Sequence, residues 1–278
     1  YEGVHYTREY FNSYPDNIMA VRLSADQAGK ISFDTNLENL INGTAYTNTV
    51  DGDTITMRDA LKTNGLNVEA QLKVINEGGS LSTGTNGGNP AITVSGADAV
   101  TLIFACGTDY KMELPNFRGE DPHKAVTARI DAAAKKGYEA LKADHIADHS
   151  ALFSRVELGF DEEIPQIPTD ELIKKYRNMI ENNGGDIPTS AEQRALEIMC
   201  YQFGRYLTIA GSRDGALPTN LQGVWGEGWF TWYGDYHFNI NVQMNYWPTM
   251  ASNLSECMKP YNDFLNVLKQ AGRNAADR

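Results

Sequence analysis

The residues best suited to chemistry lie between positions 217 and 248, where aromatic and amide side chains gather. The four tryptophans of the chain all fall in this stretch, at Trp225, Trp229, Trp232 and Trp247. Glycines interrupt the same stretch, which is typical of a loop rather than of a helix with aromatic residues along one face. Aromatic rings in such a loop can pack against the C–H face of a sugar while polar groups bind its hydroxyls. The alternative is a tryptophan-rich loop that fills a core.

The run from His237 to Asn245 alternates strictly between polar and apolar side chains. An extended chain would place the polar members on one face, namely His237, Asn239, Asn241, Gln243 and Asn245. A row of neutral amides is unfavourable to bury unless each amide finds a partner, and a solvent-facing edge strand would carry Lys, Glu and Thr. We therefore favour a polar ligand site over an edge strand. This interpretation requires an extended chain, because positions two apart diverge on a helix.

Two carboxylates, Glu227 and Asp235, lie close to these amides in the sequence. Hydrolysis of a glycoside needs an acid to protonate the leaving oxygen and a second group to activate water or act as nucleophile. Nothing in the spacing of the two residues shows that they flank one bond. A bracing role for Asp235 within the loop is an equally good interpretation.

The elements that must position this stretch differ between the two parts of the chain. Short apolar or alternating runs predict strands over 17–25, 29–37, 66–74 and 99–106. The run 66–74 alternates, so its apolar even positions, from Leu66 to Val74, would form a buried face. Its polar odd positions, from Asn67 to Lys73, would form a face exposed to water. The Gly-, Asn- and Ser-rich residues 76–90 predict a turn or loop. Many strands without helical patterns between them favour an antiparallel sandwich.

Helical patterns follow after position 110. The composition predicts helices over 123–145, 170–182, 190–210 and 258–272, with prolines and glycines in the connections. The segment 190–210 carries the strongest pattern, with Ser190 as its expected N-cap and Gly211 as its expected stop. Thr169 is the expected cap of the helix before it, which Gly184 and Gly185 would end.

Composition limits the classes of function. The formal net charge of −12 argues against nucleic acid as a partner, since phosphate binding needs a basic patch. No apolar run is long enough to predict a membrane span. The three cysteines form no disulfide framework or CxxC site, and Cys106 and Cys200 are expected to be buried thiols. The five dispersed histidines make no ligand set, so we expect no metal and no cofactor.

Two long motifs, LPTNLQGVWGEG at 217–228 and WYGDYHFNINVQMNYWP at 232–248, resemble the signature of family 95 glycoside hydrolases, the family of α-L-fucosidases. Upstream stretches resemble the same family, namely YTREYFNSYPDNIMAVRLSAD (6–26), LFSRVELGF (152–160) and YQFGRYLTIAGSRDGALP (201–218). The resemblance extends over nearly the whole chain, and its motif from Leu217 to Pro248 is much more specific than a short pattern.

The resemblance implies a multidomain α and β protein, in which an antiparallel β-sandwich is followed by a helical linker and the beginning of an (α/α)6 barrel. On this basis we expect a sandwich domain over 1–110 with its start missing, a connector and linker over 111–188, and a truncated part of the barrel over 189–278.

The resemblance also implies an inverting mechanism. Asn239 and Asn241 match the two asparagines that orient and help to activate the attacking water, braced by an aspartate, while a separate glutamate is the general acid. His237 matches a substrate-contacting position. The complete set of candidate substrate-binding residues is His237, Trp225, Trp232, Gln222 and Asp235. In the family the acid and the bracing aspartate lie well downstream, so the chain is expected to be an incomplete catalytic unit.

The expected partner is therefore an oligosaccharide or glycan with a terminal α-linked L-fucose or L-galactose. Two alternatives stay open: a non-catalytic carbohydrate-binding module, which the aromatic loop also fits, and a related (α/α)6 disaccharide phosphorylase. No phosphate-binding cluster of Gly, Ser and Lys is seen, so the phosphorylase ranks last. Enzymes of this sort are usually exported, which predicts a secreted or periplasmic location. The sequence indicates no oligomeric state.

Overall fold

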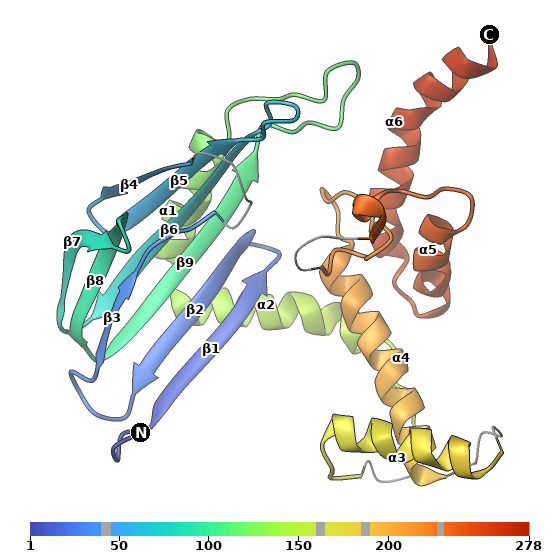
Figure 1. Ribbon diagram of the computed structural model, residues 1–278, viewed down its shortest axis with the longest axis horizontal. Helices are drawn as coiled ribbons and strands as arrows, with labels where there is room; N and C mark the ends of the chain where they lie inside the picture. The colour runs from blue at the N-terminus through green and yellow to red at the C-terminus, as the bar shows by residue number, and fades with distance from the viewer. Residues whose placement is uncertain (40–45, 160–164, 185–189, 227–230, 278) are drawn as a thin grey trace. The chain divides into compact units, whose positions relative to one another are not determined.

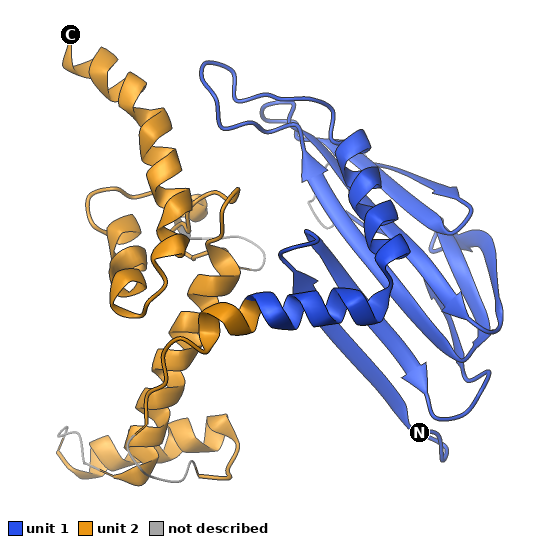
Figure 2. Cartoon of the chain, turned by 180° about the vertical axis from the view of Figure 1, so that it is seen from behind, with its two compact units in different colours: residues 1–148 blue, residues 149–278 orange. Residues whose placement is uncertain are grey.

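The computed structural model describes residues 1–39, 46–159, 165–184, 190–226 and 231–277. The chain forms two compact units, Tyr1–Asp148 and His149–Arg278 (Figure 2). Strands make up most of the first unit, and helices and loops make up the second (Figure 1). Antiparallel sheets followed by helices confirm the predicted multidomain α and β fold class.

A large antiparallel sheet has the strand order β1-β2-β9-β6-β5-β4. Its strands are β1 (Tyr6–Ser13), β2 (Ile18–Ala25), β4 (Thr47–Asp51), β5 (Thr54–Ala60), β6 (Asn67–Glu77) and β9 (Ala99–Thr108). A second sheet, of order β3-β8-β7, consists of β3 (Ile31–Thr35), β7 (Ser80–Asn86) and β8 (Asn89–Ala97). Strands β2, β3, β6 and β9 confirm the four strands that the apolar runs predicted.

The core between the two sheets makes this unit a sandwich. Ile55, Val74 and Val100 from the large sheet pack against Ile92 and Val94 from the small sheet, and all five are buried. The small sheet covers one face of the large sheet (Figure 1). Burial of these aliphatic side chains supplies the main stabilisation of the pair.

The opposite face of the large sheet is covered by helix α1 (His123–Lys136), as the view from behind shows (Figure 2). Val126, Ile130 and Ala133 of the helix pack against Ala20 and Ile103 of the sheet. The prediction of a wet face on β6 was therefore wrong, because α1 covers it, and Glu69 and Gln71 are buried there. The side-chain pattern of one strand cannot show that a helix from a later part of the chain covers its polar face.

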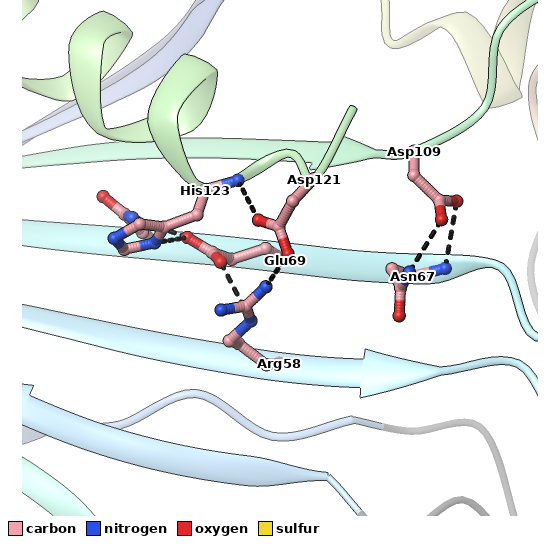
Figure 3. A network of polar contacts seen from close by, with 7 residues as sticks. Arg58, Asn67, Glu69, Asp109, Asp121 and His123 are labelled. Atoms are coloured by element: carbon pink, nitrogen blue, oxygen red, sulfur yellow. Dashed lines mark hydrogen bonds and ion pairs between the residues drawn. The ribbon is translucent and has the colours of Figure 1, made fainter. Parts of the chain in front are cut away.

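Glu69 is the centre of a polar network beneath α1 (Figure 3). Its carboxylate accepts a hydrogen bond from Gln71 Nε2 at 2.6 Å, lies 2.8 Å from His123 Nδ1 and forms an ion pair with Arg58 Nε at 3.2 Å. Asp121 completes the network, since it accepts the backbone N–H of His123 at 2.9 Å and pairs with Arg58. A buried carboxylate is tolerated when donors surround it in this way.

The prediction of a loop over 76–90 was wrong, because β7 and β8 form a hairpin there. Gly87 and Gly88 make its turn with positive φ angles of 59° and 85°. Apart from Leu81, which packs on the sandwich core, the side chains of β7 are small, polar and exposed, so backbone pairing with β8 mainly holds the strand. Its composition is consequently that of a loop.

The helix predicted over 123–145 is divided in two at Gly137. Helix α1 ends at Lys136 and α2 (Tyr138–Phe153) begins directly after it. Gly137 has φ 82° and ψ 157°, a region that is accessible essentially to glycine alone. Tyr138 and Lys142 of α2 both contact Glu9 on β1 of the large sheet. The Glu9 carboxylate accepts a hydrogen bond from the Tyr138 hydroxyl at 2.8 Å and another from Lys142 Nζ.

The second unit carries the other helices. They are α3 (Thr169–Asn182), α4 (Ala191–Gly211), α5 (Asn241–Ala251) and α6 (Lys259–Ala276), with short 3-10 turns η1 (Thr231–Gly234) and η2 (Ser255–Met258). Ser190 caps α4 as predicted, because its hydroxyl accepts the Gln193 N–H at 3.1 Å. Thr169 does not cap α3, where Pro168 occupies the N-cap position without a side-chain bond.

The thiols differ from expectation. Cys106 and Cys200 are exposed, and Cys257 is the buried one. In β9, Ala105 is buried while Cys106, on the opposite face of the strand, is exposed. Over the ranges that the structure describes, no helix combines the length and apolarity needed to cross a membrane.

Candidate active site

The polar run from His237 to Asn245 is not a strand. Helix α5 begins at Asn241, and the residues before it form a turn closed by the Val242 N–H, which donates to His237 O at 3.1 Å. The prediction of one extended polar face was therefore wrong. Backbone bonding overrides the alternating pattern here: Met244 N donates to Ile240 O at 2.9 Å, which continues the first helical turn.

The amides of this run have two different surroundings. Asn245 Nδ2 donates to Asn220 O at 2.7 Å, and Gln243 Nε2 donates to Phe238 O at 2.5 Å, so both brace the neighbouring backbone. Asn239 is exposed in the turn and Asn241 is half-buried as the first residue of α5. Neither makes a side-chain hydrogen bond with another described residue, which leaves both amide groups available to a ligand.

Trp232, Asp235 and His237 form a small cluster beside this turn, called here the His237 cluster. The indole of Trp232 meets the imidazole edge-on, with ring centroids 5.6 Å apart and an interplanar angle of 80°. Asp235 Oδ2 lies 3.9 Å from His237 Nε2, near enough to attract a protonated imidazole. The structure thus brings together three of the predicted site residues.

The backbone of the cluster is strained. Trp232 and Tyr233 have positive φ angles of 64° and 54°, a conformation that favours glycine and costs on the order of 1–3 kcal/mol per residue. Both side chains are largely exposed, at 64% and 78%. This strained backbone therefore carries two aromatic rings that face solvent, where a ligand can contact them.

A second loop, residues 212–226, holds Gln222 and Trp225. Asn220 and Gly223 exchange backbone hydrogen bonds of 2.9 Å, and Gln222 N donates to Asn220 Oδ1 at 2.9 Å, which fixes a tight turn. Leu221 N donates to Asp235 O at 3.4 Å and so joins this turn to the His237 cluster. Trp225 is about half exposed, and no contact with His237 is found within the described part of the chain.

Tyr246 anchors this loop from the buried side of α5. Its hydroxyl lies 2.9 Å from Ser212 Oγ and accepts the Thr219 N–H at 3.0 Å. Ser212 Oγ in turn donates to Cys257 O at 2.8 Å. Tyr236 adds a further bond, from its hydroxyl to Pro218 O at 2.9 Å. The loop with Gln222 and Trp225 is therefore held at its base by buried hydroxyls.

Aromatic rings from α6 support the turn from below. Phe264 stacks on Phe238 at 5.8 Å and lies 4.9 Å from Tyr236, while Tyr261 lies 5.1 Å from Tyr246. Tyr236 and Phe238 alternate with Asp235, His237 and Asn239, of which Asp235 and Asn239 are exposed and His237 is half-buried. Of the apolar members of the pattern, Phe238 packs on Phe264 and Val242 is buried, whereas Ile240 and Met244 are exposed.

Sequence reasoning missed the positioning residues of this unit. Arg205 is buried in α4, where its guanidinium donates to Phe153 O at 2.8 Å, Leu152 O at 3.1 Å and Val156 O at 3.1 Å. These carbonyls lie at the end of α2 and just beyond it. A charged residue among the apolar positions of a predicted helix is a usable signal for such a cap. Tyr246 gave no comparable signal.

The electrostatics of the site are simple. Asp235 is the only carboxylate between Thr231 and Asn245, and the remaining polar groups are neutral amides and one imidazole. Glu227 and Trp229 lie outside the described residues.

Nearby on α6, hydrogen bonds from Lys259 to Asp263 and Asp214 raise the pKa of the Lys259 ammonium. Among the described residues no group of three or more His, Cys, Asp or Glu side chains is placed to bind a metal. The arrangement suits a neutral, polyhydroxylated ligand.

Comparison with known protein families identifies the class to which a chain with this sandwich unit and this helical unit belongs. Residues 137–278 match the family model "Glycosyl hydrolase family 95 catalytic domain". Residues 1–113 match the family model "Glycosyl hydrolase family 65, N-terminal domain". The chain belongs to glycosyl hydrolase family 95. This confirms the resemblance seen in the motifs at 217–248.

Named relatives agree with the family. The chain is 34% identical to "Probable alpha-fucosidase A" of Aspergillus niger, over 91% of this chain and 32% of that protein. It is 30% identical to "Alpha-L-fucosidase 2" of Arabidopsis thaliana, over 99% of this chain and 34% of that protein. "Probable alpha-fucosidase A" of Aspergillus oryzae is 34% identical over 61% of this chain and 23% of that protein. The chain spans about a third of the length of the first two relatives.

Proposed function

We propose that the protein to which this chain belongs is an inverting glycoside hydrolase that removes terminal α-linked L-fucose, or the closely related L-galactose, from glycans. The observation that carries the proposal is the pair of amides Asn239 and Asn241, whose side chains bond no other described residue and which follow His237 and the exposed Trp232 within the residues that match the family's catalytic domain. The names of the relatives support the choice of fucose. We also propose that the protein is secreted or periplasmic, because glycan-degrading enzymes of this sort are usually exported.

In the proposed reaction, water attacks the anomeric carbon from the side opposite the leaving oxygen. The C–O bond to the leaving sugar breaks as the new C–O bond forms, the leaving oxygen takes a proton from a carboxylic acid, and the water loses a proton to a base. The amide oxygens of Asn239 and Asn241 accept hydrogen bonds from that water and orient it. An amide is a weak base, so a carboxylate must act with them.

The remaining predicted residues bind the sugar. Trp232 offers an exposed ring to the apolar face of the pyranose, and His237 donates or accepts at a sugar hydroxyl while Asp235 holds its ring. Gln222 and Trp225 line the neighbouring loop. This division assigns water activation to the turn before α5 and substrate binding to the two loops.

Inverting hydrolases place their two catalytic carboxyl groups roughly 6.5–9.5 Å apart. The segment 231–245 supplies only Asp235, which faces His237 and not the amides. We therefore propose that the general acid and the bracing carboxylate come from residues outside this segment, and that the chain by itself does not turn over.

The test is release of free L-fucose from a 2′-fucosylated oligosaccharide by the longer parent protein and by this chain. The parent should release fucose, its Asn241→Gly variant should lose turnover by more than about 100-fold, and Asn274→Gly on the exposed end of α6 should not. The chain alone should release none. Unchanged turnover in Asn241→Gly would remove the assigned role of the amide pair.

The second candidate is a non-catalytic sugar-binding module, which the exposed Trp225, Trp232 and Trp247 favour. A parent protein that quenches its tryptophan fluorescence with fucosylated oligosaccharide but releases no product would support the module. A strict requirement for inorganic phosphate would instead support the disaccharide phosphorylase.

A further inference from the structure

The sandwich unit has a groove of its own, separate from the site in the helical unit. It has a volume of about 500 Å³ and lies between the edge strand β1 and the first residues of β3. The hydroxyl of Tyr6 on β1 donates to the backbone carbonyl of Lys30 at 3.4 Å, which links the two walls. All the residues that line it belong to the first unit.

Alternation along β1 determines which side chains face the groove. Glu9 and Phe11 point to the helices, since Glu9 bonds Tyr138 and Phe11 packs on the core beneath α1. Tyr6, Arg8 and Tyr10 therefore point the other way, into the groove. Tyr6 is 39% exposed and Tyr10 58%, so two flat aromatic faces are presented to solvent with a guanidinium between them.

The charge of the groove is opposite to that of the chain. The chain has 36 acidic and 24 basic residues, yet the lining holds Arg8 and Lys30 and no carboxylate. Neither cation forms an ion pair with any residue that the structure describes. The hydroxyl of Ser32 on β3 adds a neutral polar group to the lining. An apolar protein partner would bury these cations and this hydroxyl without replacing their water, which is unfavourable.

We propose that this groove binds a glycan that carries carboxylated sugars, that is, uronic acid residues. The guanidinium of Arg8 suits two parallel hydrogen bonds to a carboxylate, Lys30 adds a second cation, and the rings of Tyr6 and Tyr10 pack on the sugar faces. The Ser32 hydroxyl binds a ring hydroxyl. The inference takes from the proposed function only that the protein acts on glycans; its residues and its ligand are different.

The experiment is calorimetric titration of this chain with a trisaccharide of galacturonic acid, compared with a neutral trisaccharide of galactose. The acidic trisaccharide should bind, and Arg8→Gln and Lys30→Gln should each weaken it by about tenfold. Tyr10→Ala should weaken both sugars. Lys62→Gln, an exposed lysine on the turn between β5 and β6, is the matched control and should leave the affinity unchanged.

Three results would overturn the proposal: no binding of the acidic trisaccharide, equal affinity for the neutral one, or unchanged affinity in Arg8→Gln and Lys30→Gln. Loss of binding in Trp232→Ala would also overturn it, because the ligand would then occupy the His237 cluster. A parent protein that releases no fucose, with a chain that still binds the acidic trisaccharide through Arg8, would reject the proposed function and leave the groove assignment standing.

Discussion

The hydroxyl of Tyr246 lies 2.9 Å from the hydroxyl of Ser212, and both groups are buried. Through this contact the first residue of the loop 212–226 is joined to the middle of α5, thirty-four positions later. Tyr246 also receives the Thr219 N–H, so one hydroxyl satisfies two partners of the same loop. The loop that carries Gln222 and Trp225 thus depends on a buried residue of α5.

Removal of this hydroxyl should loosen the loop. Tyr246→Phe leaves the Thr219 N–H without its partner, and we expect the free energy of unfolding of the helical unit to fall by about 1–3 kcal/mol. Urea denaturation followed by tryptophan fluorescence measures it. Tyr233→Phe, at an exposed ring, serves as control and should change stability by less than about 0.5 kcal/mol. Equal effects of the two variants would show that the buried hydroxyl is not the anchor.

The Glu69 network should stabilise the attachment of α1 to the sheet. Glu69→Gln removes the charge that faces Arg58 and His123, and we expect a loss of about 1–3 kcal/mol, moderated because Arg58 keeps access to water. The matched control is Glu113→Gln, which breaks an exposed pair with Lys111 and should leave the free energy of unfolding nearly unchanged, because water screens the pair. Chemical denaturation followed by far-UV circular dichroism compares them.

Alkaline pH should destabilise the sandwich unit through Tyr138. Burial, and then the hydrogen bond to Glu9, raise the pKa of the Tyr138 phenol above its ordinary value. The folded state therefore keeps a proton that the unfolded state loses above about pH 10, so unfolding releases a proton there and stability falls as pH rises. Unfolding curves between about pH 9 and 11 should show this fall, and Tyr138→Phe should show a shallower one. A variant with the same pH slope as the unmodified chain would exclude Tyr138 as its source.

The hairpin of β7 and β8 should depend on Gly79. A Cβ there would lie 2.3 Å from Ser95 O and 2.6 Å from Ala97 N, at a φ of 63°. Gly79→Ala should therefore cost about 2–5 kcal/mol through backbone strain and overlap. Gly84→Ala on the same strand meets nothing within 4 Å and should be neutral or slightly stabilising. Thermal melts of the two variants make the comparison, and a neutral Gly79→Ala would mean that the strand start moves freely.

Trp232 should contribute to substrate affinity in the longer parent protein. Trp232→Ala removes the exposed ring, and we expect KM for a fucosylated oligosaccharide to rise by about 3- to 10-fold with a smaller change in kcat. Initial-rate kinetics separate the two constants. A fall in kcat with constant KM would instead place the ring at the reacting bond.

The longer apolar or alternating runs predicted four strands, and those for β9 and β6 gave nearly the observed bounds. Strands β5 and β8 were not predicted, although they bury Ile55, Ile92 and Val94. The hairpin strand β7 was not predictable, because apart from Leu81 it is held by backbone pairing and not by side-chain burial. The buried Glu69 was missed for a different reason: the helix that covers it comes from a remote part of the chain.

The candidate site was predictable in composition and not in geometry. Its residue types and motif indicated the family, yet the alternation from His237 to Asn245 predicted a strand where a turn and a helix occur. A period of two carries weight only if the chain forms a ladder, and here the bond from Val242 N to His237 O starts a helix instead. The roles of Asn239 and Asn241 stay a prediction.

The cysteines provide built-in attachment points for spectroscopic labels. Cys106 is exposed in the sandwich unit and Cys200 is exposed in the helical unit, so each unit already carries one reactive thiol. Burial raises the pKa of the Cys257 thiol, which keeps it protonated and slow to react with maleimides. A donor and an acceptor dye can therefore be attached without introducing a cysteine. Energy transfer between them would report whether the two units move relative to each other when a glycan binds.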